Sequence, residues 1–387
     1  MYLPYIVDCG VSDADTSIIV NVRGGISLAS MFFIHRYYRR LSARTGVFIA
    51  CLCTAFAYFI YGIADGSFPV YLIGSAFAGV SYAFGSMIII SEILRRWFAK
   101  DFNLVIGMAV AGTGVATIIM PLIINAMVET FGLMMSFVYE AIFIAVLSVA
   151  VFMLIRDSPG QKGVKPYGVD EGYETEKEVV YRGKTDLPRP VWVRFGFICF
   201  VMGYIGGPGL VFLSMLFTST GSSEAEAAFC ISLVGVLMTI NKVAIGRMMD
   251  KIGRYRSILF FGSILAVGLL MTVLLEQGDV IRYIVIFLMG IGFAMMMICP
   301  AAFAKDIALP GQYFDTVRQL EIAYVFGSFV CALLPGMLMT FVGSYVASYL
   351  VMAVLLILSL ILMVQYYRRN PGIGGASRGP WAVPGIR

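Results

Sequence analysis

The sequence is poor in charge. Asp, Glu, Lys and Arg make up 13% of its 387 residues, whereas a soluble protein of this length carries about 25%. So few ionised side chains cannot cover the surface of a water-soluble domain, which excludes a cytosolic or secreted globular protein. Apolar residues account for 60% of the chain, which also excludes disorder, and the glycines follow no collagen-like period. The protein is therefore expected to lie within a membrane.

Histidine is almost absent, since His35 is the only one and it lies beside Arg36 at the end of an apolar run. This excludes a histidine cluster for a metal ion and a Ser–His catalytic pair. The seven cysteines fall mostly within apolar segments without metal-ligand spacing, so we expect small buried hydrophobic residues. No Gly-x-x-x-x-Gly-Lys phosphate loop occurs. The sequence predicts no enzyme, no metal site and no cofactor.

Long apolar runs are abundant instead. A spanning helix needs about 20 apolar residues, and long runs with internal Pro and Gly are typical of a helical bundle, not of a barrel. The fold class predicted is an all-α polytopic membrane protein. Its expected spans are residues 17–37, 47–64, 70–94, 104–128, 133–155, 191–216, 225–249, 258–275, 283–304, 322–342 and 345–367.

One long polar segment, residues 157–190, divides these spans into two groups. It contains four prolines and a mixed charged run at residues 170–178, which is typical of a linker. We therefore predict an N-terminal bundle of five spans in residues 1–156 and a C-terminal bundle of six spans in residues 191–369. A tail, residues 370–387, follows the second bundle.

The basic residues define an orientation. If the first span runs from outside to inside, 25 of the 28 Lys and Arg residues fall on one face. Of the other three, Arg282 lies in an outer loop, and Arg23 and Lys242 lie within spans. Because Lys and Arg gather at the cytoplasmic ends of spans, we predict a multi-pass protein of the cell membrane with its N-terminus outside. The linker and the tail are predicted to be cytoplasmic, and the basic residues are topology signals, not a nucleic-acid site.

Five spans before the linker and six after it suggest an internal repeat that is one helix short. The basic loop at residues 246–256 follows the second span of the second bundle, and residues 35–46 form a similar basic loop after the first span. Counted from the start of its bundle, this first loop comes about 19 residues earlier than the loop of the second bundle. This difference is the length of one spanning helix. The sequence predicts a six-plus-six design whose first helix is absent from this chain.

The loop Gly246-Arg-Met-Met-Asp250-Lys-Ile-Gly253-Arg254-Tyr-Arg256 resembles the loop signature of the major facilitator superfamily. The stretch Arg96-Trp-Phe-Ala-Lys100, the Gly-rich residues 107–114 and Pro121 resemble the clade of oxalate/formate antiporters and monocarboxylate transporters. The first loop departs from the pattern because it lacks the acidic residue. Asp101-Phe102 also stands where that clade usually has basic residues.

This resemblance implies a secondary transporter, an antiporter in the oxalate/formate case, that works by alternating access between two bundles. It also implies a gating loop on the cytoplasmic side, in which a carboxylate can meet the positive N-terminus of a neighbouring helix. Ordinary juxtamembrane charges are the alternative interpretation. The predicted gating residues are Gly246, Asp250, Lys251, Gly253 and Arg254.

Small residues line two adjoining faces of the predicted span 104–128. Gly107, Ala111 and Gly114 share one face, and Ala109, Gly112 and Ala116 share the other. Small residues at this spacing let helix backbones approach closely. We expect tight packing of this helix, and a face that slides during transport is the sharper alternative.

Lys242 is the leading candidate for substrate binding, since an ammonium within a span is costly and such residues are functional candidates by default. By position Lys242 matches the Arg with which the oxalate/formate family binds the carboxylate of its substrate. The second basic residue of that family is missing here, where the corresponding residues lie around Tyr324. The alternative is a lysine that reaches back to the inner interface. Four further residues are predicted to contribute, namely Asn241, Arg23, Tyr204 and Tyr324.

The predicted substrate is therefore a small organic anion such as a mono- or dicarboxylate. Glu140, the one acid expected well inside a span, is predicted to be structural, with proton coupling as the alternative. The chain is expected to be a monomer in the lipid bilayer that binds no nucleic acid. The alternative functions are a truncated or inactive transporter fragment, or a transporter of a non-anionic small molecule.

Overall fold

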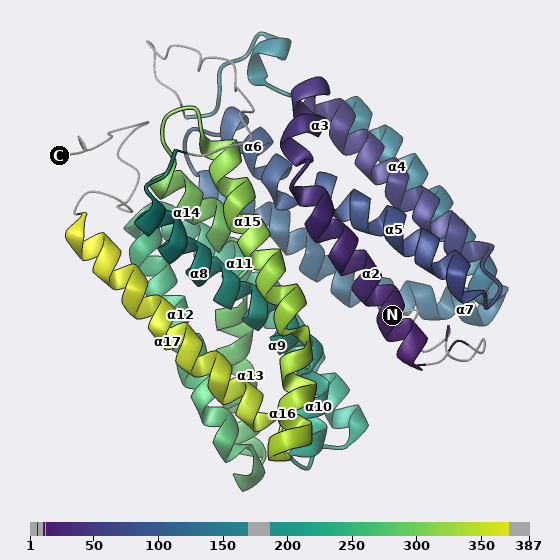
Figure 1. Ribbon diagram of the computed structural model, residues 1–387, viewed down its shortest axis with the longest axis vertical. Coiled ribbons are helices and arrows are strands. Elements are labelled where there is room, and N and C mark those ends of the chain that lie inside the picture. Colours follow the sequence, from purple (N-terminus) through teal and green to yellow (C-terminus); the bar gives the residue numbers. More distant parts are fainter. Residues whose placement is uncertain (1–5, 7–10, 12, 169–185, 371–387) are drawn as a thin grey trace. The chain divides into compact units, whose positions relative to one another are not determined.

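The structure, a computed structural model, describes residues 6, 11, 13–168 and 186–370 (Figure 1). Within these residues the regular structure is helical, and the one β-bridge joins Phe98 to Tyr167. The predicted all-α class is therefore confirmed. Cys9, the tail and most of the predicted linker lie outside the described residues.

Nine helical segments of the described chain are long and apolar enough to cross a membrane. A tenth is possible if α2 (Asp13–Met31) and α3 (Ile34–Arg40), which meet at 60°, form one bent span. Helices α5 (Phe68–Phe84) and α6 (Met87–Trp97) together make one span. The other helices with a spanning segment are α4 (Ala43–Gly62), α7 (Phe102–Leu154), α8 (Arg189–Gly206), α11 (Glu224–Ile252), α12 (Arg254–Leu270), α15 (Tyr313–Val330) and α17 (Val346–Arg369).

The chain forms two compact units. The first contains the described residues up to Trp97 together with residues 119–166, and the second contains residues 98–118, 167–168 and 186–370. The first part of α7 therefore belongs to the second unit, although it precedes the linker. At Gly132, where φ is 78°, the backbone of α7 leaves the helical conformation, which separates the predicted fourth and fifth spans.

In the first unit, α5 packs against both α2 and α4 (Figure 1). Small residues permit this close approach, since a Cβ atom at Gly79 of α5 would lie 2.6 Å from the carbonyl oxygen of Arg23 in α2. The core of the unit includes the fully buried rings of Tyr71 and Phe137. Ser42 caps the start of helix α4, since its side chain accepts a hydrogen bond from the backbone N–H of Thr45.

In the second unit, α8 packs along α15, and α12 packs against α17 and α13 (Asp279–Phe293). A Cβ atom at Gly203 of α8 or at Gly327 of α15 would collide with the facing backbone, so these helices lie almost in main-chain contact. Helix α11 begins with a capping box, in which Ser223 and Glu226 bond each other's backbone N–H groups.

Several expected spans are interrupted, among them two in the second unit. The stretch predicted at residues 283–304 is two helices, α13 and α14 (Cys299–Ile307), with residues 294–298 between them. Pro300 explains this break, because proline lacks an N–H and its ring clashes with the carbonyl four residues earlier. The stretch at residues 191–216 is divided at Gly207 into α8, α9 (Pro208–Val211) and α10 (Leu213–Ser219).

The span predicted to start at Ile322 begins earlier, since α15 starts at Tyr313. Arg318, which the sequence placed in a cytoplasmic loop, is instead 5% exposed inside this helix. Glu321 is buried as well, so the expectation that Glu140 is the one acid well inside a span was wrong. Polar residues three apart interrupt the apolar run, and hydropathy alone therefore assigned them to a loop.

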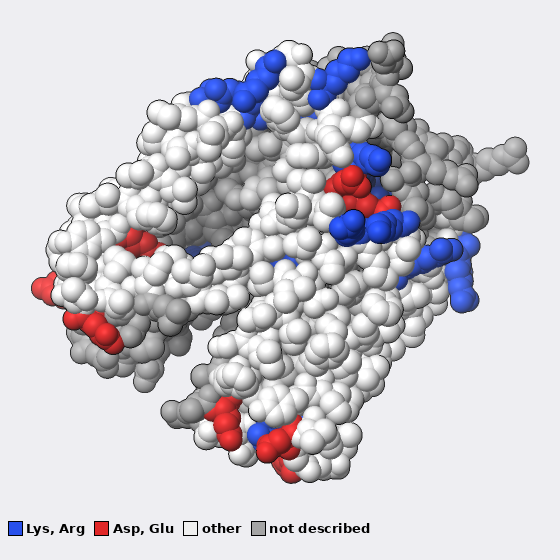
Figure 2. Space-filling view, turned by 180° about the vertical axis from the view of Figure 1, so that it is seen from behind, with Lys and Arg blue, Asp and Glu red and all other residues white. Residues whose placement is uncertain are grey.

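The sides of the described helices carry almost no charge, and charged side chains gather at the helix ends (Figure 2). Large apolar side chains such as Phe143, Val146 and Leu154 are instead well exposed along the sides. This distribution suits a protein surrounded by lipid. Four described cysteines are buried and two, Cys51 and Cys53, are half-buried, as expected of small hydrophobic residues.

Candidate functional site

Lys242 lies on α11 and is 3% exposed. Its Nζ atom donates a hydrogen bond to Oγ1 of Thr113 on α7, at 2.9 Å. No carboxylate of a described residue forms an ion pair with this ammonium. The structure thus buries a positive charge whose observed partner is a neutral hydroxyl, an arrangement that leaves the charge uncompensated.

The direction of the Lys242 side chain follows from the register between α7 and α11. Gly246 of α11 lies against the backbone of Asn103, and the backbone of Lys242 lies against Gly107. The two helices are therefore antiparallel, and Thr113 lies on the side of Lys242 away from the predicted inner end. The ammonium points toward the middle of the span and not back to the inner interface.

The small-residue face of α7 makes this close register possible. A methyl group at Gly107 would collide with the carbonyl oxygen of Lys242, and one at Gly114 would collide with the Thr239 side chain. Gly112 on the adjoining face has no atom within 4 Å of such a methyl group. The predicted tight packing is therefore confirmed for the face of Gly107 and Gly114, and it brings Thr113 within reach of Lys242.

Asp250 forms the contact that its place in the loop predicted. Its Oδ1 accepts from the backbone N–H of Asn103 at 3.3 Å and from the Asn103 side-chain amide at 2.6 Å. Its Oδ2 accepts from the backbone N–H of Leu104 at 2.7 Å. Backbone N–H groups in the first turn of a helix have no partner within the helix, and the positive end of the helix dipole attracts a carboxylate. Asp250 therefore caps the N-terminus of α7.

The rest of the loop leads into helix α12 and holds its first turn. Gly253 has φ of 97°, a left-handed conformation that favours glycine, and it provides the N-cap position of α12. Arg254 then forms an ion pair with Asp306 of α14, in which its Nε and Nη2 atoms both donate to Oδ1. The other carboxylate oxygen of Asp306 accepts from the Tyr367 hydroxyl of α17 at 2.7 Å. Lys251 is exposed beside them.

The other predicted substrate residues do not join Lys242 through any contact of the described chain. Asn241 donates to the carbonyl oxygen of Leu237 in its own helix at 2.8 Å. Tyr204 is fully buried with its hydroxyl 3.0 Å from Oγ of Ser348. Tyr324 lies against Gly206, and Arg23 belongs to the first unit, where its guanidinium lies 5.6 Å from the centre of the Tyr82 ring.

Several polar residues of the second unit escaped the sequence interpretation. Thr113 was one, although a hydroxyl between two glycines on a small-residue face was a usable signal. Asp306 and Tyr367 were others, and no sequence pattern pointed to their contact with Arg254, because three separate helices supply the three residues. The buried ionisable residues of α15 form the last group.

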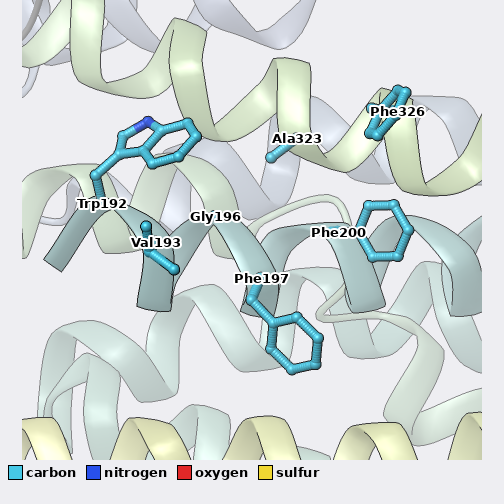
Figure 3. A pocket seen from close by; sticks show the side chains of 7 residues that line it. All are labelled: Trp192, Val193, Gly196, Phe197, Phe200, Ala323 and Phe326. Atoms are coloured by element: carbon cyan, nitrogen blue, oxygen red, sulfur yellow. The ribbon is translucent and has the colours of Figure 1, made fainter. Parts of the chain in front are cut away.

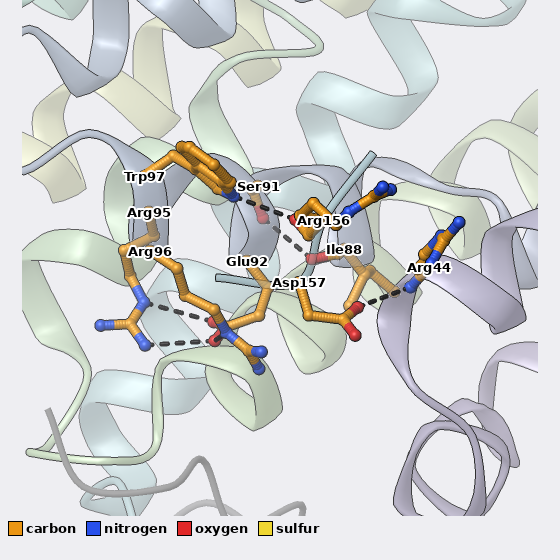
Figure 4. A network of polar contacts seen from close by, with 9 residues as sticks. All are labelled: Arg44, Ile88, Ser91, Glu92, Arg95, Arg96, Trp97, Arg156 and Asp157. Carbon is orange, nitrogen blue, oxygen red and sulfur yellow. Dashed lines mark hydrogen bonds and ion pairs between the residues drawn. The ribbon is translucent and has the colours of Figure 1, made fainter. Parts of the chain in front are cut away.

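The first unit has a polar network of its own at the end of α6 (Figure 4). Glu92 is fully buried and accepts from Nε of Arg96 at 2.9 Å and from Nη2 of Arg95 at 3.2 Å. Asp157 accepts from the backbone N–H of Arg44 at 2.6 Å. The neighbouring indole N–H of Trp97 donates to the Arg156 carbonyl oxygen at 3.0 Å.

In the second unit, a pocket of about 240 Å³ lies between α8 and α15 (Figure 3). Its lining consists of Trp192, Val193, Gly196, Phe197, Phe200, Ala323 and Phe326. No charged side chain lines it and none of the predicted substrate residues does, so it offers no charge to an anion.

The comparisons with known proteins agree on the kind of molecule. The family described as Major Facilitator Superfamily matches residues 1–314, and no curated protein sequence matches the chain significantly. The human organic anion transporter MFSD10 (TETRAN) is 14% identical with a TM-score of 0.67, over 89% of this chain and 83% of that one. A bacterial homologue of the iron transporter ferroportin is 14% identical with a TM-score of 0.68, over 95% and 94% of the two chains. The E. coli fucose:proton symporter FucP is 12% identical with a TM-score of 0.66, over 91% and 94%.

Proposed function

Because the chain belongs to the major facilitator superfamily and is a membrane transporter, we propose that it carries a small organic anion, a mono- or dicarboxylate, by alternating access. The observation that carries this proposal is Lys242, which is 3% exposed and whose ammonium meets a hydroxyl and no carboxylate of the described chain. A buried cation without a counter-ion attracts an anion, because each charge would relieve the cost of burying the other.

The chemistry of Lys242 favours a small carboxylate. An ammonium is a compact point charge, whereas the guanidinium of Arg is a fork that suits bidentate recognition. One Lys therefore fits a monocarboxylate at least as well as a dicarboxylate. Thr113 orients the ammonium, since its hydroxyl accepts from Lys242 and donates to the carbonyl oxygen of Val110. We propose four further contacts during the transport cycle, namely Asn241, Tyr204, Tyr324 and, in the first unit, Arg23.

The loop at residues 246–256 is proposed as the gate. Asp250 caps α7 through two backbone N–H groups and one side-chain amide, a contact that can form in one state and break in another. Gly246 permits the close approach, Gly253 begins α12, and Arg254 ties α12 to α14. Lys251 adds a charge at the same end. A carboxylate at a helix N-terminus is a stabilising but breakable interaction.

The similar structures do not select the substrate. Their names refer to an organic anion, to fucose with a proton and to iron, so their shared fold serves different cargoes. We propose membership of the oxalate/formate and monocarboxylate clade, including its antiport, from the residues at 96–121. A non-anionic substrate remains the second candidate, and it would leave the charge of Lys242 without a role.

The placement of the protein is part of the same proposal. We propose a monomer in the cell membrane with its N-terminus outside and the linker and tail in the cytoplasm, supported by the 25 of 28 basic residues on one predicted face. In this orientation the Asp250 contact lies on the cytoplasmic side and Lys242 lies deeper in the span.

The proposal is tested by uptake of labelled formate, lactate and oxalate into proteoliposomes. We expect uptake by the natural protein, its loss in Lys242→Gln, and partial retention in Lys242→Arg, which keeps the positive charge. Lys162→Gln is the matched control, because it removes an exposed lysine at the start of the linker and should leave uptake unchanged. Undiminished uptake in Lys242→Gln would remove Lys242 from the site and the anion proposal with it.

A further inference from the structure

The first half of α15 carries three ionisable side chains on successive turns. Asp315 is 1% exposed, Arg318 is 5% exposed and Glu321 is 7% exposed. They follow one another at intervals of three residues, so they lie on neighbouring positions along the helix. Glu321 is the deepest of the three, about 12 Å from the helix start at about 1.5 Å per residue. Buried charges in a spanning helix are rare unless they have a function.

Glu321 differs from the two residues that precede it. Nε of Arg318 lies 3.7 Å from Oδ1 of Asp315, so these two side chains neutralise each other. The carboxyl group of Glu321 has no hydrogen bond or ion pair with any described residue. The deepest acid of α15 is therefore the one without a compensating charge.

The helices packed against α15 do not supply such a charge to Glu321. On α8, the fully buried thiol of Cys199 lies close enough to Cys299 of α14 and to Glu321 to interact with both electrostatically. The two charged residues of α14 have partners elsewhere, since Lys305 lies 4.1 Å from the centre of the Phe102 ring and Asp306 pairs with Arg254. On α15 itself, Arg318 and Asp315 are paired with each other.

These surroundings favour the neutral acid. An isolated carboxylate in an apolar interior is strongly disfavoured, and such a group takes up a proton instead. A metal cation is a poor alternative, because hard cations need several oxygen ligands and no group of three or more His, Cys, Asp or Glu among the described residues could hold one. The pocket between α8 and α15 has no side-chain oxygen in its lining that could bind such an ion.

We propose that Glu321 is the proton-binding group of this transporter, and that it holds a proton in the state described here and releases it toward the predicted inner end. In the release step the O–H bond of the Glu321 carboxyl group breaks, the proton passes to water near the Asp315–Arg318 pair, and the carboxylate remains. Reprotonation in the other state completes the cycle. This inference rests on the proposed function, since a proton is useful here only if it moves with a substrate.

Two transport assays on the reconstituted protein test the inference. Counterflow exchange needs no net movement of protons, whereas accumulation driven by an imposed pH gradient does. We expect Glu321→Gln, which mimics the protonated acid, to retain exchange and to lose accumulation. Glu321→Asp, which keeps the carboxyl group, should restore part of the accumulation, and the control Glu140→Gln should retain both activities.

An infrared measurement keeps the inference testable without a known substrate. The protonated carboxyl band of the purified protein should be present at neutral pH, should disappear at high pH, and should be missing from Glu321→Gln but present in Glu140→Gln. An identical band in Glu321→Gln, or pH-driven accumulation that survives in it, would overturn the proposal. Loss of exchange and accumulation together in Glu321→Gln, with no partial recovery in Glu321→Asp, would make Glu321 a structural residue. If the natural protein takes up no anion while the band still depends on Glu321, the proposed function fails and the proton site stands.

Discussion

The basic ends of the two units each contain a buried acid, but the partners of the acid differ between the units. Each holds a buried acid near the end of a span, Glu92 on α6 and Asp306 on α14. In the first unit the partners of Glu92 are Arg95 and Arg96, three and four residues away on the same helix. In the second unit the partners of Asp306 come from two other helices, since α12 supplies Arg254 and α17 supplies Tyr367. A local pair stabilises one helix, whereas the second network ties three helices together.

The loops before α4 and α12 show the same contrast. When the first residues of these helices, Ala43 and Arg254, are aligned, Arg39 stands at the position of Asp250. Arg39 is exposed, and a basic side chain cannot cap a helix N-terminus. Asp250 caps α7 with both carboxylate oxygens. Both halves therefore have a basic loop before the aligned helix, and the loop of the second half adds a carboxylate that caps α7.

The largest expected effect comes from breaking the three-helix network. Arg254→Met would leave the buried carboxylate of Asp306 without its cation, and removing one partner of a buried pair costs about 3–5 kcal/mol. We expect a clear loss of thermal stability in detergent. The comparison residue is Arg44, whose guanidinium bonds the carbonyl oxygen of Phe152. Arg44→Met keeps the backbone bond to Asp157 and removes one hydrogen bond of a charged group, which should cost only about 1.5–3 kcal/mol. Equal losses in the two variants would contradict the contrast between the units.

A smaller effect is expected for the helix cap. Asp250→Asn removes the charge but keeps an acceptor oxygen, and a hydrogen bond to a charged group contributes about 1.5–3 kcal/mol. Because the cap is proposed to form in one gating state, we expect transport to fall roughly tenfold or more while membrane insertion and abundance stay near normal. The control is Arg39→Gln, which changes the residue aligned with Asp250 in the loop before α4. This variant should transport normally. A normal rate in Asp250→Asn would reduce this loop to a topology signal.

The smallest effect concerns the packing between α7 and α11. Gly107→Ala should push the helix away from the Lys242 carbonyl oxygen, at a cost of about 1–3 kcal/mol for overpacking. Gly112→Ala adds the same methyl group to the open face of the same helix. It should be neutral, or stabilising by up to about 1 kcal/mol. Thermal melting and uptake of both variants check this, and similar behaviour would argue against a close-packed seam.

Much of the fold could be predicted from the sequence, because apolar runs and basic flanks follow directly from the solvent properties of the bilayer. The loop at 246–256 also predicted that Asp250 meets a helix N-terminus, and the small residues at 107 and 114 predicted a close contact. The six-plus-six design with an absent first helix and the exact bundle boundaries stay predictions.

The polar residues of α15 could not be predicted in the same way. Asp315, Arg318 and Glu321 lower the local hydropathy enough to resemble a loop, and their burial depends on helices that are distant in the sequence. The break between α13 and α14 was missed for the opposite reason, since residues 294–298 are as apolar as a helix and only Pro300 marks the interruption. Hydropathy indicates whether a segment lies in lipid or in water, but not which helices pack against it.

The central claim, that the ammonium of Lys242 binds a carboxylate, is tested most directly by equilibrium binding of labelled lactate and oxalate to the purified protein. We predict saturable binding to the natural protein, similar binding to Lys242→Arg, and binding weaker by about 30-fold or more in Lys242→Gln, since breaking a buried charge pair costs at least about 2 kcal/mol. Binding of equal affinity to the natural protein and to Lys242→Gln would contradict the claim.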